Sequence, residues 1–204
     1  MKHRTLTGPH DKNRVAERLR DSYVGIAGAG GLGSNVAMSL ARAGVGRLLI
    51  ADFDRVEESN LNRQYFFLDQ VGMYKVDALK KNIQKAVRDC KVEVLNRKLE
   101  RGSMAAPFSE VDVIVEALDS ASVKVAFIEE VLTEFPEKHL VAASGVAGIG
   151  GSNRIVQKDL GNLILVEDPQ ALSSDVEVLL SPKVGQFAHH QANIVLELLL
   201  EGDR

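Results

Sequence analysis

A glycine-rich segment at residues 28–33 limits the possible folds of this chain more than any other feature of the sequence. The segment reads GAGGLG and matches the pattern Gly-x-Gly-x-x-Gly. An apolar run at residues 23–27 precedes it, and small and apolar residues at helical spacing follow at residues 32–43. A strand, a glycine turn and a helix in this order let backbone N–H groups approach phosphates at the helix N-terminus. The segment therefore predicts a nucleotide-binding α/β fold.

Further apolar runs alternate with stretches of helical spacing. Expected strands cover residues 47–51, 92–95, 111–115 and 140–143, and expected helices cover residues 75–87, 123–131 and 184–200. Because strands that alternate with helices form parallel sheets, we expect a Rossmann-like, doubly wound, mostly parallel sheet with helices on both faces. Its ligand should lie at the carboxyl ends of the strands.

The pattern changes after residue 144. Four glycines fall within residues 145–151, and short apolar runs follow at residues 154–156 and 163–166. We expect these runs to form a small antiparallel C-terminal extension. Residues 167–183 are expected to form a loop before the last helix.

Length and charge narrow the class of protein. A chain of 204 residues suits one domain over residues 1–204, in which residues 1–20 form an N-terminal arm. Its 25 basic and 28 acidic residues give a net charge of −3, which argues against a nucleic-acid partner and against an anionic membrane surface. No run approaches the roughly 18 apolar residues of a membrane span, so we expect a cytoplasmic protein.

Cysteine usage excludes two kinds of site. Cys90 is the one cysteine of the sequence, so an intramolecular disulfide and a four-thiolate zinc site are both ruled out. Cys90 lies at an expected turn from helix to strand, where a cysteine is usually inert. His189 and His190 are adjacent in the last helix and cannot easily share one ligand, so we interpret them as helix surface or interface.

An acidic residue supports the nucleotide interpretation. Asp52 directly follows the second expected strand, where a carboxylate accepts hydrogen bonds from ribose hydroxyls. Together with Gly28, Gly30, Gly31 and Gly33, it predicts a binding site for an adenine nucleotide. This motif is shared by ATP-binding and NAD-binding proteins, so it does not choose between them.

The next segment is more specific. Residues 52–64 read DFDRVEESNLNRQ, and they follow GAGGLGSNVAMSLARAGVGRLLIA at residues 28–51. This combination resembles the signature of the ubiquitin-activating-like superfamily, whose bacterial members include the ThiF, MoeB and HesA adenylyltransferases. The resemblance extends from about residue 21 to about residue 202. It implies ATP-dependent adenylylation of the C-terminal glycine carboxylate of a small ubiquitin-like sulfur-carrier protein that ends in Gly-Gly.

The resemblance also implies roles for cationic residues. A carboxylate is already ionised at neutral pH and needs no general base, so the barrier lies in bringing it to an anionic α-phosphate. Arg63 and Lys75 match positions that bind the triphosphate in the family, and a guanidinium and an ammonium suit that task. Both are therefore candidate catalytic residues.

Further matched positions complete the implied site. Asn60 matches a residue that binds phosphate or sugar oxygens, with Ser59 and Gln64 as weaker candidates. Asp119 matches the carboxylate that holds Mg²⁺, an ion that prefers oxygen ligands and shared phosphates, and it is the third candidate catalytic residue. The implied cofactors are ATP and Mg²⁺, without zinc.

The sequence also departs from many relatives. It lacks their two Cys-x-x-Cys pairs and their nucleophilic cysteine, since residues 158–182 contain no cysteine. Covalent chemistry on that loop is thus excluded, and the adenylate should be released or passed to an external sulfur donor. In this respect the chain is most similar to short, zinc-free members that act on the thiamine sulfur carrier, called ThiS-like here.

The resemblance implies a homodimer in which an N-terminal arginine reaches the phosphates of the partner subunit. The candidates are Arg4, Arg14, Arg18 and Arg20, and the sequence does not choose among them. Three alternatives to the thiamine pathway remain open at this point. They are a carrier of the molybdopterin or cysteine pathway, an NAD-dependent Rossmann oxidoreductase, and a non-catalytic scaffold that binds a carrier.

Overall fold

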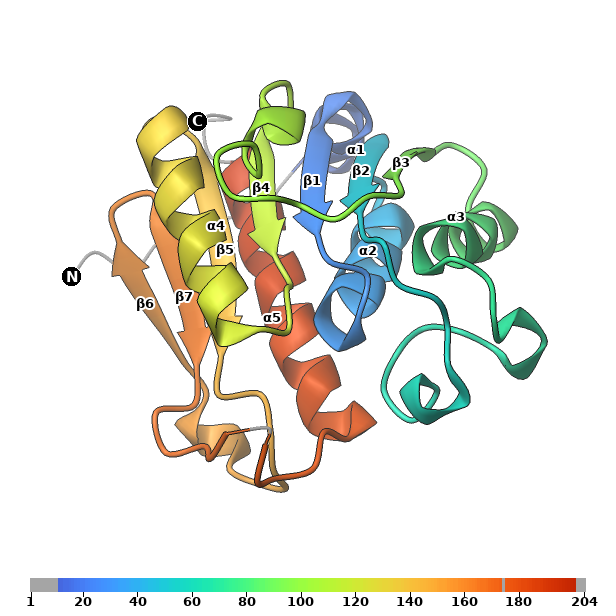
Figure 1. Cartoon of the computed structure of the whole chain (residues 1–204). Coiled ribbons are helices and arrows are strands. Elements are labelled where there is room, and N and C mark those ends of the chain that lie inside the picture. The colour runs from blue at the N-terminus through green and yellow to red at the C-terminus, as the bar shows by residue number, and fades with distance from the viewer. Residues whose placement is uncertain (1–10, 174, 201–204) are drawn as a thin grey trace.

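The computed structural model describes residues 11–173 and 175–200. Figure 1 shows the elements in chain order, and their bounds are α1 Lys12–Asp21, β1 Tyr23–Ala27, α2 Gly31–Ala43, β2 Arg47–Ala51, η1 Glu58–Asn60, η2 Leu68–Gln70, α3 Lys75–Ala86, β3 Lys91–Leu95, η3 Ala106–Phe108, β4 Val113–Glu116, α4 Ala121–Glu134, β5 His139–Ser144, η4 Ser152–Arg154, β6 Val156–Leu160, β7 Leu163–Glu167 and α5 Ser181–Leu200.

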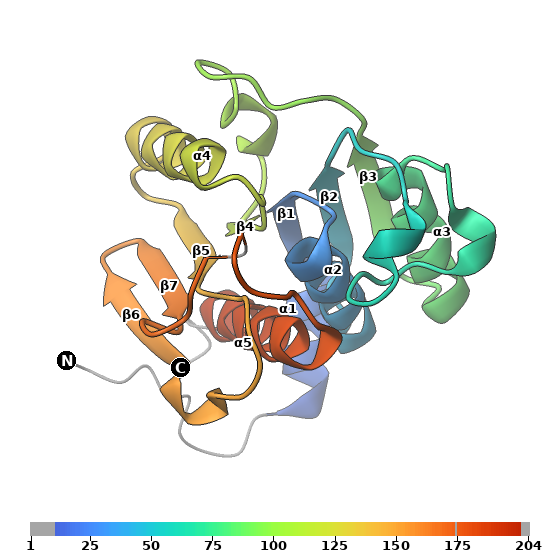
Figure 2. The same cartoon turned by 60° about the horizontal axis from the view of Figure 1, so that its bottom comes forward.

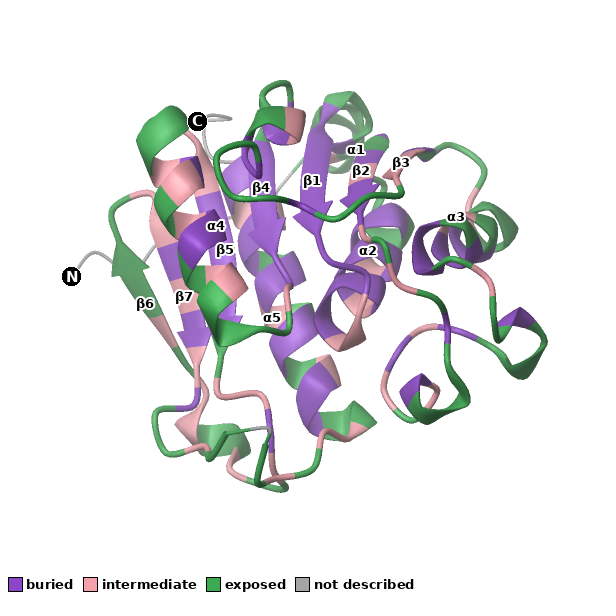
Figure 3. Ribbon diagram, in the orientation of Figure 1, coloured by how far each residue is buried: buried purple, intermediate pink, exposed green. Residues whose placement is uncertain are grey.

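The strands form a seven-stranded sheet in the order β3-β2-β1-β4-β5-β7-β6. All neighbouring strands are parallel except β6 and β7, which pair antiparallel at one edge. The prediction of a Rossmann-like, mostly parallel sheet with a small antiparallel extension is therefore confirmed. Figure 3 shows that the central strands β1 and β4 are buried along their whole length, as is typical of parallel strands covered on both faces.

Helices cover both faces of the sheet, as Figures 1 and 2 show together. Buried side chains of α1, α2, α3 and α5 form one core cluster on the first face. On the second face, α4 and η3 form another, in which the rings of Phe108 and Phe127 meet edge to face at 5.5 Å. The sheet therefore separates two apolar layers, and it is open to ligands mainly at its ends.

The direction of the chain reverses at β1. From β1 the chain proceeds through α2 to β2 and then β3 on one side, and it returns to pair β4 with the other side of β1. Such a switch point leaves a crevice at the carboxyl ends of the two strands, which is where ligands of open α/β sheets bind.

Most element boundaries differ by a few residues from the sequence-based prediction, and three differences concern α1, β6 and α5. Helix α1 occupies residues 12–21, within the expected arm, and its N-cap Asp11 accepts a hydrogen bond from the backbone of Asn13 at 2.9 Å. Strand β6 covers Val156–Leu160 rather than residues 154–156, because it pairs along its whole length with β7. Helix α5 begins at Ser181, three residues before the expected start.

Among the described residues, no helix has both the length and the apolar character needed to cross a bilayer.

Candidate active site

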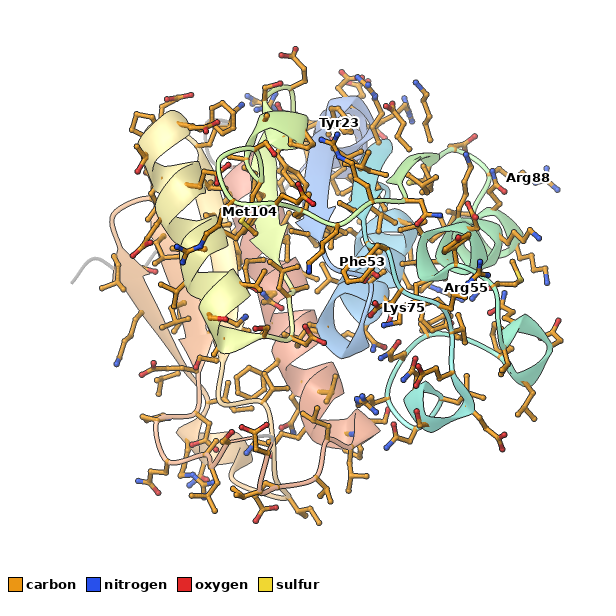
Figure 4. All side chains as sticks on the ribbon, in the orientation of Figure 1. Tyr23, Phe53, Arg55, Lys75, Arg88 and Met104 are labelled. Carbon is orange, nitrogen blue, oxygen red and sulfur yellow. The ribbon has the colours of Figure 1, made fainter. Side chains whose placement is uncertain are left out.

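A cavity of about 630 Å³ lies at the carboxyl ends of β1, β2, β4 and β5. Of the residues predicted for the site, those that line this cavity are Gly28, Gly30, Gly31, Asp52, Arg63, Gln64, Lys75 and Asp119. Figure 4 shows two of the lining side chains, Phe53 and Lys75, at the end of the sheet where β2 leads into the following loop. The fold thus brings most of the predicted residues to one place.

The glycines of the loop have different physical reasons to be glycine. Gly28 has φ +101°, and a Cβ there would lie 2.4 Å from the carbonyl oxygen of Ala117. A Cβ on Gly33 would lie 1.9 Å from the carbonyl oxygen of Gly28, so both positions are closed by protein. A Cβ on Gly30 would find Gln64 Nε2 as its nearest neighbour, at 3.9 Å. The space over Gly30 is therefore available to a ligand.

Asp52 fixes the shape of this loop. Its Oδ2 accepts a hydrogen bond from the backbone N–H of Ala29 at 2.7 Å, and its Oδ1 accepts one from the backbone N–H of Asp54 at 2.8 Å. Charge-assisted bonds of this kind are strong. The carboxylate therefore ties the glycine loop after β1 to the loop after β2 while lining the cavity itself.

Two cations reach the cavity from different elements. Lys75 begins α3 and is buried, and its Nζ lies 2.7 Å from Oδ2 of Asp54. Arg63 is half-buried, and its Nη1 donates to the carbonyl oxygen of Ser59 at 3.1 Å and to Oδ1 of Asn62 at 2.8 Å. An anionic ligand would find both positive charges on one wall.

Gln64 presents an unsatisfied acceptor on that wall. The side chain is buried, and its Oε1 has no hydrogen-bond partner among the described residues. Buried polar atoms are nearly always hydrogen-bonded, so an isolated acceptor that lines a cavity indicates a ligand or water with an N–H or O–H group.

Ser59, Asn60 and Gly33 do not line the cavity. Oδ1 of Asn60 accepts a hydrogen bond from the backbone N–H of Glu57 at 3.1 Å, and Oγ of Ser59 donates to Oε2 of Glu57 at 3.2 Å. In the structure these two side chains organise the short helix η1, and Gly33 packs against the loop. All three residues therefore support neighbouring segments and do not contribute to the surface of the cavity.

Asp119 enters the cavity from the segment between β4 and α4. Just before it, the fully buried Glu116 accepts a hydrogen bond on Oε1 from the backbone N–H of Leu118 at 2.7 Å and forms an ion pair with Lys124. Burial raises the pKa of the Glu116 carboxyl, and the ammonium of Lys124 opposes that rise. One carboxylate thus holds both ends of the segment that carries Asp119.

A second wall was not predicted. It is formed after the ends of β2 and β3 by Phe53, Arg97, Lys98 and Leu99, and Lys98 Nζ lies 5.9 Å from the centroid of the Phe53 ring. The segment after β3 has no local pattern that distinguishes it from a solvent-exposed loop. Phe53 could have been predicted more easily than the residues after β3, because it lies between Asp52 and Asp54 in the segment that resembles the family.

Cys90 and the paired histidines lie outside the residues that line the cavity. Cys90 is buried, and desolvation raises the pKa of its thiol to about 11. His189 is exposed, and its Nδ1 lies 2.6 Å from the carbonyl oxygen of Gly185. Burial lowers the pKa of His190.

Of the four N-terminal arginines that are candidates for reaching a partner subunit, the three that the structure describes lie on α1. Nε of Arg18 donates to the carbonyl oxygen of Leu199 at 2.9 Å, which fastens α1 to α5. Arg14 and Arg20 also lie on α1, whereas Arg4 lies outside the described residues.

Comparison with known families settles the class of the chain, because the ThiF family matches residues 5–203. The chain belongs to the ThiF family. This ThiF-family chain is also similar to ubiquitin-like modifier-activating enzyme 5 from several organisms. It is 42% identical to the protein of Drosophila virilis over 80 residues, which is 39% of this chain and 20% of the relative. It is 55% identical to the protein of Oryza sativa subsp. japonica over 62 residues, which is 30% of this chain and 15% of the relative. The chain thus spans about a fifth of the length of these curated relatives.

Solved structures share the fold of this ThiF-family chain. E. coli tRNA N6-threonylcarbamoyladenosine dehydratase, TcdA, in complex with AMP has a TM-score of 0.85 at 21% identity, with 94% of this chain and 91% of that chain covered. E. coli MccB with ATP has a TM-score of 0.71 at 20% identity, with 91% of this chain and 57% of that chain covered. At these identities the likeness establishes the fold alone.

Proposed function

We propose that this ThiF-family chain uses ATP to adenylylate the C-terminal carboxylate of a small ubiquitin-like protein. The observation that carries the proposal is that four features line one cavity. They are the open space over Gly30, the buried cation of Lys75, the acceptor of Gln64 without a partner and the carboxylate of Asp119. The names of the relatives, ubiquitin-like modifier-activating enzymes, support the class of substrate.

The residues present fit an adenine nucleotide. The missing side chain at Gly30 leaves room for phosphate oxygens at the N-terminus of α2, where the helix dipole favours negative charge. Asp52 offers acceptor oxygens for ribose hydroxyls, and Gln64 Oε1 requires a donor. Phe53 and Leu99 provide apolar surface for the base.

The proposed reaction needs positioning and charge rather than proton transfer. A carboxylate oxygen of the C-terminal glycine attacks the α-phosphorus of ATP, an acyl-phosphate bond forms, and the bond from that phosphorus to the β-phosphate bridging oxygen breaks. The products are the acyl-adenylate and pyrophosphate. Arg63 and Lys75 offset the repulsion between the two anions and the charge that develops on pyrophosphate.

Mg²⁺ also fits the site. Among the described residues there is no group of three or more His, Cys, Asp or Glu side chains that could hold a metal ion. Mg²⁺ at nucleotide sites is commonly held by one or two carboxylates together with substrate phosphates. The single carboxylate of Asp119 is therefore enough for this mode of binding. When bound, the ion would neutralise phosphate charge.

The C-terminal part of the chain provides the other half of the cavity, which we call the acyl wall. Its residues are Ala143, Ser144, Gly145, Val146, Ala147, Leu172, Ser173, Leu179 and Val184. The acyl wall is lined by small and apolar groups, which suits a narrow tail ending in glycines. We infer that the carrier tail lies along this wall and brings its carboxylate to the nucleotide half.

Within this class we propose the ThiS-like thiamine sulfur carrier as the substrate and a homodimer as the working form. The absence of cysteines from residues 158–182 supports release or external transfer of the adenylate. Carriers of the molybdopterin and cysteine pathways, and a ubiquitin-like modifier, are the competing substrates.

The test is carrier-dependent ATP–pyrophosphate exchange with each candidate carrier. Exchange with the thiamine carrier that is lost in both Asp119→Ala and Arg63→Ala is the expected result. A matched variant, Arg88→Ala, removes an exposed arginine that does not line the cavity, and it should retain exchange. Exchange with another carrier alone would reassign the pathway.

Two outcomes would overturn the proposed activity itself. Binding of NADH without binding of ATP would support the NAD-dependent oxidoreductase. Tight binding of a carrier without any nucleotide binding would support the non-catalytic scaffold.

A further inference from the structure

A buried ion cluster lies behind the acyl wall. Asp168 has a fully buried side chain, and its Oδ1 and Oδ2 accept hydrogen bonds from Nε and Nη2 of Arg154 at 3.1 and 3.0 Å. Lys183, only 5% exposed, donates from Nζ to Oδ2 of Asp168 at 3.0 Å. One carboxylate is therefore shared between two cations, and these neighbours hold its pKa well below the usual range.

The cluster joins three segments that are distant in the sequence. Asp168 directly follows β7, Arg154 ends η4, and Lys183 lies in the first turn of α5. The Nζ of Lys183 also donates to the carbonyl oxygen of Ala147 at 2.8 Å. The position of Ala147, which lines the cavity, is thus set by a hydrogen bond to Lys183.

Gly145 is held by the same cluster from the other side. A Cβ on Gly145 would lie 2.4 Å from the carbonyl oxygen of Asp168, so the two backbones are in close contact. The backbone N–H of Asp168 in turn donates to the carbonyl oxygen of Ser144 at 3.3 Å. Together with the bond from Lys183, these contacts fix both ends of the segment 145–147.

Asp168, Arg154 and Lys183 do not line the cavity themselves. Nζ of Lys183 and the backbone N–H of Asp168 contact the backbone of the acyl wall, so any effect on a ligand must pass through that wall. Apolar residues of similar volume often stabilise a fold as well as a buried ion pair does. Ionic hydrogen bonds, however, fix direction as well as distance, which is what a wall of fixed shape requires.

We propose that Asp168, Arg154 and Lys183 are positioning residues that set the shape of the acyl wall and thereby the affinity for the tail of the acyl substrate, while leaving nucleotide affinity unchanged. This inference rests on the proposed function. The ligand class is an extended C-terminal peptide whose last residues are small. The nucleotide residues lie on other elements, and the hydrogen bonds of Asp52 and Lys75 go to Ala29 and Asp54 rather than to the cluster.

The test compares Lys183→Met with Lys183→Arg in the pyrophosphate exchange assay on the full chain. In Lys183→Met we expect the KM for the carrier to rise about tenfold, because a small displacement of a positioning wall is costly. The KM for ATP and the Kd for AMP should change less than about twofold, and Lys183→Arg should restore most of the carrier KM. Lys158→Met, which removes the exposed lysine that pairs with Glu167 on the hairpin of β6 and β7, is the matched control and should leave all constants unchanged.

Equal changes in the constants for carrier and nucleotide, or no change in either, would overturn the inference. If Lys183→Met does not fold, Arg154→Lys replaces it, because it keeps the charge but loses the paired hydrogen bonds to Asp168. An absence of exchange by the unmodified protein with every carrier would instead refute the proposed function. The two failures are therefore distinct.

Discussion

The carboxylate of Asp52 is bonded to the backbone N–H of Ala29 at 2.7 Å, so an acidic residue after β2 holds the glycine loop that follows β1. The same side chain accepts the backbone N–H of Asp54. Two adjacent parallel strands are therefore joined at their carboxyl ends by one side chain.

Replacing Asp52 with Asn tests this relationship. The amide has one acceptor oxygen and one NH₂ group, so one of the two backbone N–H groups loses its acceptor. A hydrogen bond to a charged group contributes about 1.5–3 kcal/mol, so we expect AMP affinity to fall about 10- to 100-fold, as measured by calorimetry. Unchanged affinity would show that neither the loop geometry nor the ribose depends on this carboxylate.

Gly30 and Gly33 should separate ligand binding from folding. Gly33→Ala would place a methyl group 1.9 Å from a carbonyl oxygen and should strongly destabilise the protein. Gly30→Ala meets no protein atom closer than 3.9 Å, so its thermal unfolding midpoint should be near that of the unmodified chain. Its ATP affinity should nevertheless drop, because the methyl group occupies the space that phosphate oxygens need. Normal ATP binding by folded Gly30→Ala would contradict the placement of the phosphates.

Lys75 should act on the triphosphate more than on the nucleoside. We expect Lys75→Met to slow pyrophosphate exchange about 100-fold or more and to change AMP affinity little, since removing one preorganised donor costs about that factor. Asp54→Asn is the matched control, because it removes the partner of Lys75 while keeping the cation. Exchange rates near normal in Lys75→Met would exclude this role.

The buried pair of Glu116 and Lys124 predicts a pH-dependent stability defect. In Lys124→Met the carboxylate is left buried without its cation, which costs about 3–5 kcal/mol near neutral pH. Burial already raises the pKa of Glu116 above its unfolded value of about 4.3, and loss of Lys124 raises this pKa further. A raised folded-state pKa gives stability that is present at low pH and lost as pH rises, so the defect should be small near pH 4 and large at pH 7.

Urea unfolding of Lys124→Met at several pH values measures this defect. The double variant Glu116→Gln/Lys124→Met, which lacks the titrating carboxyl, should recover part of the stability and lose the pH dependence. A defect of equal size at all pH values would indicate lost packing instead.

Cys90 should be unreactive in the folded protein. With a thiol pKa of about 11 and little exposure, the fraction of thiolate near neutral pH is very small. We expect slow labelling by a thiol reagent at pH 8 in buffer and fast labelling in urea, and exchange activity should persist in Cys90→Ala. Rapid labelling of native protein, or lost activity in this variant, would reopen a role for the thiol.

Much of the sheet could be predicted because its signals are local. Strands β1 and β2 have the predicted bounds, since parallel strands buried on both faces appear as continuous apolar runs. Gly28 and Asp52 were predicted as neighbours in space because parallel strands bring successive carboxyl ends together.

The remaining features depend on contacts that a sequence does not display. Helix α1 is mostly charged and buries Leu19 alone, so its pattern does not indicate a packed helix. Asp168 and Lys183 lie 15 positions apart in the sequence, and charges in a loop are usually solvated, so only the fold shows that they are paired and buried. Likewise, only the fold shows that Lys98 lines the cavity.

The order of elements along the chain assigns the two halves of the cavity to different segments. The nucleotide half is built by segments up to residue 124, and the acyl wall by segments from residue 143 onward, with the hairpin of β6 and β7 attached at one edge of the sheet through β5. The halves touch where Asn62 bonds to the carbonyl oxygen of Leu179. The backbone N–H groups of Gly28 and Ala29, however, bond to residues 51 and 52 and not to the C-terminal segments. Under the proposed function, we expect that residues 145–183 can be exchanged between relatives to change the acyl group that is accepted while the phosphate chemistry stays constant.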